Sequence, residues 1–469
     1  MDAQTVFLFV TTWSSAFFSI FVSAMIKKGD KKLIKGWIFY DWANSVYNLV
    51  ISSAIFPIFY SNVTEAHYLE SVGRSELLEG ETVMVDFMGA HVSSSTLFSF
   101  TLCASFLIVS ILSPILSGVA DYSGSKKKFL QFFCYLGALS CMTLYWFNTK
   151  WLELSMVSVF LASIGFWNSL VFYNAYLPEI ADPEDHDNIS ARGFSMGYFG
   201  SMILLVICLV MIIFIGSHVT RYCFILVGLW WIGFAQIPFR RLPSNVYDKK
   251  VDKTNLLTKG FRELRQVTRE FIKTKRLKRY LIAFFFFNTG VQTVMLMAVT
   301  FAKREINWGS IGDNGLIISI LLIQILGAAG AYLMSWLSGK IGNLRTLIIV
   351  VFWWVINCVI AYFITEAVEF FILAASVGFV MGGVQALSRS TYSKFLPETE
   401  DHASYFSFYD ASEKIGIVLG TFFFGLMELV TGDLRDSVLS IVAFFTIGLL
   451  LLLIVPKKEK VIETDPKHN

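Results

Sequence analysis

Polar and charged side chains recur at helical spacing inside long apolar stretches of this chain. In the first of these stretches they stand three or four positions apart, at Asp41, Asn44, Asn48 and Ser52. Because that spacing places them on one face of a helix, and because such groups are costly unless they face protein or a hydrated cavity, they predict a path for a polar solute. The candidate substrate-binding or proton-coupling residues are Asp41, Trp42, Asn44, Asn48, Asn168, Asn174, Asn288, Gln292, Gln385, Arg389, Asp410 and Glu413.

Asp41 and Arg389 are the charges with the clearest candidate chemistry. Asp41 could bind a substrate amino group or a proton, and Arg389 could hold a substrate carboxylate with its fork of donors. Both residues also lie a few positions from one end of their apolar stretches. They could therefore form an ion pair between helices that closes one face of the protein without touching substrate. Substrate binding and an ion pair between helices would each compensate a charge within the membrane, so both roles stay open for these two residues.

The polar side chains of the other apolar stretches could also either line a cavity or join helices. Asn44, Asn288 and Gln385 can line a cavity, which we expect, or join helices by hydrogen bonds. Glu413 and Lys414 are adjacent in sequence and point in different directions on a helix, so at most one of them is expected to face a cavity. Lys414 is expected to pair locally. Trp42, next to Asp41, is expected to form a wall of the substrate site.

Nothing in the sequence supports an enzyme. The six cysteines lie in or beside apolar stretches without paired metal spacing, and the six histidines form no pair suited to one helix face. A phosphate-binding loop that ends in Gly-Lys-Ser/Thr does not occur. We therefore expect no catalytic residues, no metal and no cofactor.

The composition indicates an all-α membrane protein. Hydrophobic residues make up 55% of the chain and charged residues only 16%, whereas a soluble domain has about a quarter charged residues. The apolar blocks are long enough to cross a hydrocarbon layer of roughly 30 Å as helices. Twelve transmembrane helices are predicted, near 37–60, 96–119, 128–147, 154–177, 194–216, 221–239, 280–301, 314–337, 345–365, 369–392, 405–430 and 435–455.

The positive charges are distributed unevenly over the segments between these spans. The side that holds both ends of the core carries 30 of the 38 Lys and Arg residues, the opposite side carries six, and Arg389 and Lys414 fall within spans. Because basic segments resist translocation, the rich side is predicted to be cytoplasmic. The same asymmetry supports the number of helices, since a missed helix would scramble it.

One further apolar stretch, residues 5–24, precedes the first predicted span. It does not begin with the positive charge of a signal peptide. It is either a loosely attached extra helix or the product of a miscalled start, in which case Met25 is the natural first residue.

The chain contains an internal duplication. Leu177-Pro178-Glu179, with an acidic turn after it, matches Leu396-Pro397-Glu398 at an offset of 219 residues. Two six-helix halves in the same orientation are the expected result. The predicted parts are an N-terminal extension (1–30), a first half (31–240), a basic cytoplasmic linker (241–278), a second half (279–456) and a cytoplasmic tail (457–469).

A glycine- and acid-containing turn follows the second span. Gly118, Asp121 and Gly124 precede Lys126 in a segment that resembles the loop signature of the major facilitator superfamily. The glycines permit a tight turn and close helix approach, and Asp121 can accept from a helix N-terminus or an arginine across the interface between the halves. The predicted cytoplasmic gate comprises Gly118, Asp121, Gly124, Lys126, Glu179, Arg192 and Glu398. In it, Glu179 and Glu398 are expected to act as paired latches that meet Arg192, Lys394 or the linker.

Several local motifs are more specific than the superfamily. They are Tyr40-Asp41-Trp42-Ala43-Asn44-Ser45, Asn174-Ala175-Tyr176-Leu177-Pro178-Glu179-Ile180, Asn288-Thr289-Gly290-Val291-Gln292-Thr293 and Gly383-Val384-Gln385-Ala386-Leu387-Ser388-Arg389-Ser390. Together they resemble the branch that includes the autophagy-linked vacuolar amino-acid effluxers of fungi and their bacterial relatives, over Lys31 to about Pro456. The resemblance implies efflux of neutral amino acids in the fungal members. The absence of any vacuolar or autophagic feature and the bare N-terminus favour a bacterial inner-membrane protein.

The expected function is secondary active transport of a small organic solute, such as a neutral amino acid, by rocking of the two halves, with proton coupling. A transporter of lipid-like or drug-like amphiphiles is the alternative within this class, and a transport-inactive sensor or scaffold is the alternative outside it. The expected partners are the solute, protons and the lipid bilayer, not nucleic acid, and the chain is expected to act as a monomer.

Overall fold

The computed structural model describes residues 28–78, 81–244, 246–247, 255–309, 312 and 314–456. The apolar stretch 5–24, Met25 and the tail 457–469 lie outside these residues. Within the described part, twelve helical segments are long and apolar enough to cross a membrane. The prediction of an all-α membrane protein with twelve spans is therefore confirmed.

Six of the spans form the first half of the chain. Their helices are α2 (Lys31–Val46) with its continuation through the π-helix η1 (Tyr47–Ala54) and α3 (Ile55–Val72), then α4 (Ser94–Ser123), α5 (Lys126–Thr143), α6 (Leu152–Asn174), α8 (His186–Ile215) and α9 (Thr220–Arg241). Short elements connect them, namely β1 (Met84–Phe87), β2 (Ala90–Ser93), η2 (Leu144–Trp146), η3 (Thr149–Trp151), α7 (Leu177–Ile180) and η4 (Ser217–Val219). β1 and β2 pair as an antiparallel hairpin between the first two spans.

The second half supplies the other six spans. They are α11 (Lys275–Glu305), α12 (Asn314–Ile341), α13 (Asn343–Phe363), α14 (Ala367–Phe395), α15 (His402–Thr431) and α16 (Leu434–Leu453). The helix α10 (Leu256–Lys273) precedes them and belongs to the linker between the halves.

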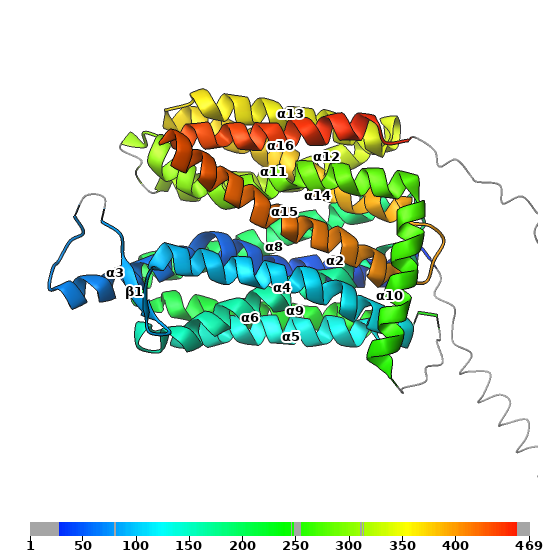
Figure 1. Ribbon diagram of the computed structural model, residues 1–469, viewed down its shortest axis with the longest axis horizontal. Helices are drawn as coiled ribbons and strands as arrows, with labels where there is room; N and C mark the ends of the chain where they lie inside the picture. The colour runs from blue at the N-terminus through cyan, green and yellow to red at the C-terminus, as the bar shows by residue number, and fades with distance from the viewer. Residues whose placement is uncertain are drawn as a thin grey trace, which may run out of the picture.

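The halves lie one above the other in Figure 1, with their helices along the long axis. α10 runs across the ends of these helices at the right, and the β1–β2 hairpin lies at the left. We call these two ends of the molecule the linker side and the hairpin side. Helix α15 runs diagonally, so its linker-side end packs on α4 of the first half while its other end stays with the second half.

Local sequence explains where several helices begin and end. Gly73 ends α3 and Gly124 ends α4, both in the left-handed conformation that glycine adopts without steric cost. The side chain of Asp30 accepts a hydrogen bond from the Lys32 backbone N–H at the start of α2, and Asp433 does the same for α16. The turn at Gly124 allows α4 and α5 to reverse direction with only two residues between them.

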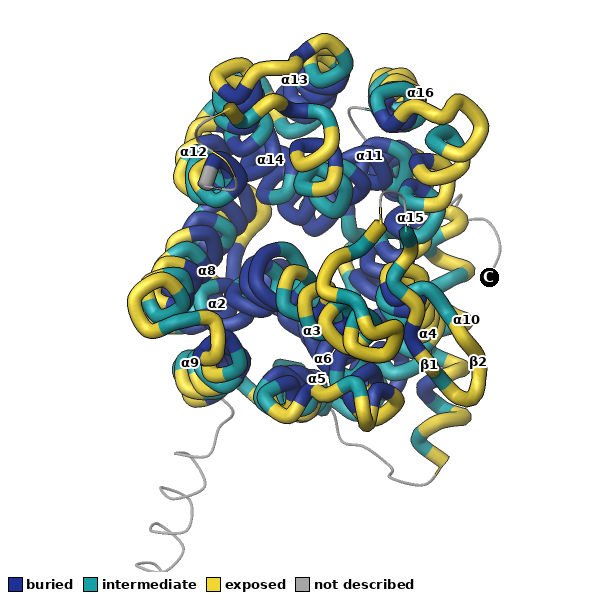
Figure 2. Tube along the Cα trace, turned by 90° about the vertical axis from the view of Figure 1, so that its left-hand side faces the viewer, coloured by how far each residue is buried: buried dark blue, intermediate teal, exposed yellow. Residues whose placement is uncertain are grey.

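Large apolar side chains remain exposed around the rim of the bundle. Examples from four different helices are Ile111 at 65%, Phe214 at 82%, Phe352 at 53% and Leu429 at 81% exposure. In the end-on view of Figure 2, the buried faces of the helices turn inward and the exposed faces turn outward. An apolar rim of this kind suits contact with lipid tails rather than water.

The first span departs from regular α-helix at its centre. Residues Tyr47–Ala54 form a π-helix, whose hydrogen bonds join residues five apart. This wider turn shifts the register of the polar face, so that Ser53 rather than Ser52 follows Asn48 on the cavity wall. The expectation for Ser52 assumed a regular α-helix throughout and was wrong for that reason.

Candidate functional site

A central cavity of about 1440 Å³, measured to its open mouth, lies between the two halves. Its walls come from the first span and from α6, α8, α11, α12, α14 and α15. Nine of the residues predicted from sequence line it, namely Asp41, Asn44, Asn48, Asn174, Asn288, Gln292, Gln385, Arg389 and Glu413. The structure thus brings together polar residues that are up to 372 positions apart in the chain.

Asp41 and Arg389 form an ion pair at the linker-side end of the cavity. Arg389 Nη2 donates to Asp41 Oδ2 over 3.1 Å, and the Tyr173 hydroxyl donates to the same oxygen over 2.7 Å. The two charged side chains are 3% and 6% exposed. Because Asp41 is on α2 and Arg389 is on α14, this pair joins one half of the protein to the other.

The rest of the Arg389 guanidinium is held by the first half as well. Its Nε donates to Ser190 Oγ over 2.9 Å, and Nη2 donates to the Ser190 backbone oxygen over 3.0 Å. The guanidinium carbon lies 4.6 Å from the centre of the Trp37 ring and 4.1 Å from that of Phe194. Gly193 leaves room for this arrangement, since a Cβ there would overlap the Asp41 carboxylate.

The amide side chains that line the cavity differ in their hydrogen-bond partners. Tyr198 donates to Gln385 Oε1 over 2.6 Å, so that amide contributes to contact between the halves. By contrast, the side-chain nitrogens of Asn44 and Asn288 are buried and have no hydrogen-bond partner among the described residues. A buried donor left unpaired costs about 1–3 kcal/mol. A polar solute in the cavity would recover part of that cost.

A second charged group lies on α15. Lys414 Nζ is 2.9 Å from Asp410 Oδ1 and 2.9 Å from Glu413 Oε2, and Gln292 donates to the other oxygen of Glu413. Glu413 lines the cavity whereas Lys414 is buried beneath it, as the sequence predicted for these two neighbours.

Three predicted site residues do not line the cavity. Trp42 stacks on Trp230 with ring centres 5.5 Å apart, because its side chain points to α9. Asn168 Oδ1 and Asp410 Oδ2 both lie within hydrogen-bonding distance of Ser113 Oγ, within the packing of α4, α6 and α15. The expectation of a Trp42 wall was wrong, since adjacency to Asp41 in sequence puts the two side chains on different helix faces.

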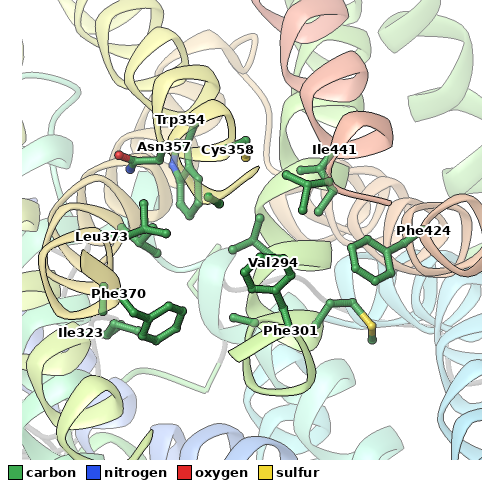
Figure 3. A pocket seen from close by; sticks show the side chains of 16 residues that line it. Val294, Phe301, Ile323, Trp354, Asn357, Cys358, Phe370, Leu373, Phe424 and Ile441 are labelled. Atoms are coloured by element: carbon green, nitrogen blue, oxygen red, sulfur yellow. The ribbon is translucent and has the colours of Figure 1, made fainter. Parts of the chain in front are cut away.

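An apolar side pocket of about 630 Å³ opens inside the second half. In Figure 3, Trp354 and Leu373 lie on one side of it and Ile441 and Phe424 on the other. It shares four wall residues with the central cavity, namely Val294, Ala298, Ile323 and Val377. The two spaces therefore adjoin, one polar and one apolar.

Polar contacts also join the halves at the linker side. Asp121, at the end of α4, accepts from the backbone N–H groups of Ala403 and Ser404, the first turn of α15. A carboxylate is favourable at a helix N-terminus, where these donors have no partner within the helix. Of the two partners considered from sequence for Asp121, the structure shows the helix N-terminus.

Glu179 is fully buried between the halves. It pairs with Lys126 and lies 3.2 Å from His402 Nδ1. The same His402 nitrogen lies 3.2 Å from the hydroxyl of Tyr247 in the linker, and burial together with nearby carboxylates, Glu179 first, raises the pKa of that tyrosine. The Tyr247 hydroxyl therefore stays protonated at neutral pH.

A further carboxylate, different from Asp121 and Glu179, joins the halves at the turn after α12. The turn after α12 lacks a counterpart to Asp121, but Asp187 of α8 reaches it from the other half. Asp187 accepts from Ser338 over 2.8 Å and from Asn343 over 2.7 Å, and Lys394 is 2.7 Å away. Sequence comparison of the two loops did not reveal Asp187, because its partners come from three other helices.

The expected pairing of Glu179 and Glu398 as equivalent latches is wrong for this conformation. Glu398 is exposed, and within the described ranges neither its side chain nor that of Arg192 makes a hydrogen bond or an ion pair. Lys394 pairs with Asp187 instead. The two copies of the duplicated motif therefore differ in this conformation, since Glu179 is buried and Glu398 is exposed.

Gly118 has a role in packing the linker helix. A Cβ at Gly118 would overlap the backbone oxygen of Gly260 in α10, and a Cβ at Gly260 would stand 2.6 Å from Val119. The two glycines thus let α10 lie directly on the end of α4. Helix α10 also reaches the second half, where Phe271 packs 5.2 Å from Phe408 of α15.

Two six-helix halves around a polar cavity, closed on one side by contacts between the halves, define a multi-pass membrane transporter of the major facilitator superfamily. The chain belongs to the family described as vacuole effluxer Atg22 like, whose model matches residues 29–464. This confirms the resemblance drawn from the sequence motifs. It also confirms the expectation that the protein is not an enzyme, because the family consists of transporters.

Relatives and solved structures agree with this assignment. The chain is 30% identical over 445 residues to an uncharacterized MFS-type transporter, YxiO, of Bacillus subtilis, which covers 92% of this chain and 97% of that protein. It is 26% identical to autophagy-related protein 22 of Kluyveromyces lactis, with 92% and 94% covered. The fucose:proton symporter of E. coli superposes with a TM-score of 0.61 at 13% identity, covering 91% of this chain and 98% of that one.

Proposed function

We propose that this protein is a secondary transporter that moves a small zwitterionic solute, a neutral amino acid, through its central cavity by alternating access. The unpartnered amide nitrogens of Asn44 and Asn288 carry this proposal. They come from different halves and line the same cavity, where they offer donors to the oxygens of a bound carboxylate. Glu413 on the same wall offers acceptor oxygens to an ammonium group.

The side pocket supports a neutral side chain on that solute. Its lining is almost entirely aliphatic and aromatic, with Asn357 as its one polar side chain within the described residues. An ammonium and a carboxylate in the polar cavity would leave the solute's side chain free to enter the adjoining apolar space. The same pocket favours the second candidate, an amphiphile whose tail occupies it.

The ion pair of Asp41 and Arg389 is proposed to be a lock rather than a ligand site in this conformation. The two groups touch directly across the halves and leave no space for a solute between them. They would separate only when the linker side opens.

The excess of Lys and Arg supports an orientation with the linker side and both ends of the twelve-helix core in the cytoplasm, and a plasma membrane location is proposed from the Bacillus subtilis relative. In that orientation, the contacts between the halves close the cytoplasmic side in this structure.

Thermal unfolding of the purified protein with candidate ligands tests the proposal. We expect a neutral amino acid to raise the melting temperature of the parent and of Asp41→Asn, but not of Asn44→Ala or Asn288→Ala. Asn62→Ala, which removes an exposed amide on α3, is the matched control and should respond like the parent. Stabilisation by lysolipids alone would favour the amphiphile, and stabilisation lost in Asp41→Asn would make Asp41 a ligand.

A further inference from the structure

The charged group on α15 lies in the third and fourth turns of that helix, and neither the proposed binding site nor the lock explains its members Asp410 and Lys414. Asp410, Glu413 and Lys414 fall within five residues of one helix, so two carboxylates share one ammonium. Lys414 is fully buried and its Nζ lies 3.7 Å from the centre of the Trp167 ring in the first half. Buried charges are costly unless each is compensated. With one ammonium for two acids, the group has one uncompensated negative charge when both acids are ionised.

The hydrogen bonds around Asp410 show where a proton would be held. Ser113 Oγ lies 3.2 Å from Asp410 Oδ2 and 3.0 Å from Asn168 Oδ1. Asn168 donates through its nitrogen to the Ile164 backbone oxygen over 3.1 Å, which fixes its oxygen toward Ser113. A hydroxyl has one hydrogen to donate, so Ser113 cannot satisfy two acceptor oxygens. Both oxygens have a hydrogen-bond partner only if Asp410 is protonated and donates to Ser113, because Ser113 can then donate to Asn168.

Glu413 is placed differently. It accepts from Gln292 through one oxygen and pairs with Lys414 through the other, so its surroundings supply donors and suit the ionised form. It also forms part of the cavity wall, which gives the buried group a contact with the transport path.

Helix α14 packs on this part of α15 through Tyr392 and Tyr409, and its charged residue there, Arg389, is paired with Asp41. The other helices packed against this part of α15 add no further charge at its level. The charged residues of α4 and α6 are Asp121 and Glu153, near the ends of those helices, and those of α11 and α16 also lie within the first five or the last three residues of each helix. The linker helix α10 contacts α15 in its first two turns, as far as Phe408. The titratable group therefore consists of Asp410, Glu413 and Lys414, with the neutral side chains of Ser113, Asn168, Trp167 and Gln292 around it.

We propose that Asp410 is the residue that binds the coupling proton of this transporter, an inference that rests on the proposed transport function. The proton enters from the cavity beside Glu413 and converts the Asp410 carboxylate to a carboxylic acid. The carboxylic acid then donates to Ser113 of α4, and Ser113 donates to Asn168 of α6, so that every hydrogen bond from α15 to the first half in this series is formed. Loss of the proton leaves two acceptors facing one hydroxyl and weakens this contact between the halves. Protonation therefore favours the conformation described here, in which contacts between the halves close the linker side.

A distance measurement between spin labels tests this inference without any substrate. Cysteines replace Lys150 and Thr365, which are exposed on the hairpin side of opposite halves, and the half-buried Cys103 is changed to serine. Between about pH 5.5 and 8, a range over which an acid with an altered environment can titrate, we expect the parent to shift from the longer toward the shorter distance. Asp410→Asn, which mimics the protonated acid, should keep the longer distance at every pH.

Matched variants separate a proton site from a merely structural residue. Glu428→Gln removes a partly exposed carboxylate on the same helix, which pairs with Arg304, and should leave the pH response unchanged. Ser113→Ala removes the acceptor of the acid and should reduce the size of the shift. An unchanged shift in Asp410→Asn would overturn the proposal, whether or not an amino acid is transported.

Transport in proteoliposomes provides the second readout. With the ligand found by thermal unfolding, Asp410→Asn should lose accumulation driven by a pH gradient and lose proton flux driven by solute, yet keep exchange of labelled for unlabelled solute. Retention of solute-driven proton flux in this variant would contradict the proposal. Loss of exchange along with proton flux would also contradict it, since Asp410 would then be needed for the transport cycle itself.

Discussion

Substitution of Gly193 by alanine is expected to weaken the lock between the halves without removing either charge. Gly193 lies in α8, where an added methyl group would overlap the Asp41 carboxylate oxygen and stand 2.9 Å from Arg389 Nη2. Neither neighbour can move far, because Tyr173 and Ser190 hold them. The ion pair itself must therefore lengthen.

The size of the effect follows from the contacts. A retreat of about 1 Å is needed to reach ordinary contact distance, which takes the 3.1 Å pair beyond hydrogen-bonding range. A hydrogen bond to a charged group contributes about 1.5–3 kcal/mol. The higher helix propensity of alanine acts on α8 in both conformations alike and does not offset this loss, so the cost to the closed lock is about 1.5–3 kcal/mol. At about 1.4 kcal/mol per factor of ten, this shifts the equilibrium between the two conformations by roughly 10- to 140-fold toward linker-side opening.

The spin-label pair at Lys150 and Thr365 measures this shift as a larger population at short distance. Gly233→Ala is the control, since Gly233 is a helical glycine of α9 with nothing within 4 Å of an added Cβ. It should leave the distance distribution as in the parent. If Gly193→Ala and Gly233→Ala give the same distribution, the Asp41–Arg389 pair does not hold the linker side closed, and the reasoning fails.

Two further predictions concern the linker side. Glu179→Gln should lower the free energy of unfolding by about 3–5 kcal/mol, because it leaves the buried Lys126 without its partner. Glu398→Gln, at the exposed copy of the motif, should change the free energy of unfolding by less than about 0.5 kcal/mol. Equal effects of the two substitutions in denaturant titrations would contradict the difference in burial. Gly118→Leu should displace α10 from α4, because even a Cβ at position 118 overlaps the backbone oxygen of Gly260. Amide hydrogen exchange in α10 should then become faster. An unchanged exchange rate would show that the close approach of these two glycines does not hold α10 in place.

The sequence was sufficient to predict the spans because each is a local property. An apolar block of about twenty residues satisfies its own backbone hydrogen bonds as a helix and needs no knowledge of its neighbours. The polar faces were predicted for the same reason, and nine of the twelve candidate site residues line the cavity. Ser52 was misplaced because no local rule predicts the π-helix at Tyr47–Ala54.

The partners of the charged residues were not predictable in this way. Asp187 pairs with Ser338, Asn343 and Lys394, which lie more than 150 residues away in sequence. Trp42 and Asp410 were both predicted to belong to the site, yet the rotation of their helices places their side chains in contacts between helices and not on the cavity wall. Such contacts depend on how two halves dock, which the spacing of residues along one helix does not encode.

By itself, the sequence determined the membrane class, the number of helices, the duplicated plan and the presence of charge within the membrane. Hydrophobicity and helical periodicity act within single segments, so these features can be read from neighbouring residues. The tertiary structure alone decided which charges form the lock, which amides stay unpartnered in the cavity, and that Ser113 faces two acceptors. Those features arise because α14 and α15 of the second half meet α2, α4, α6 and α8 of the first, and only packing brings them within hydrogen-bonding distance.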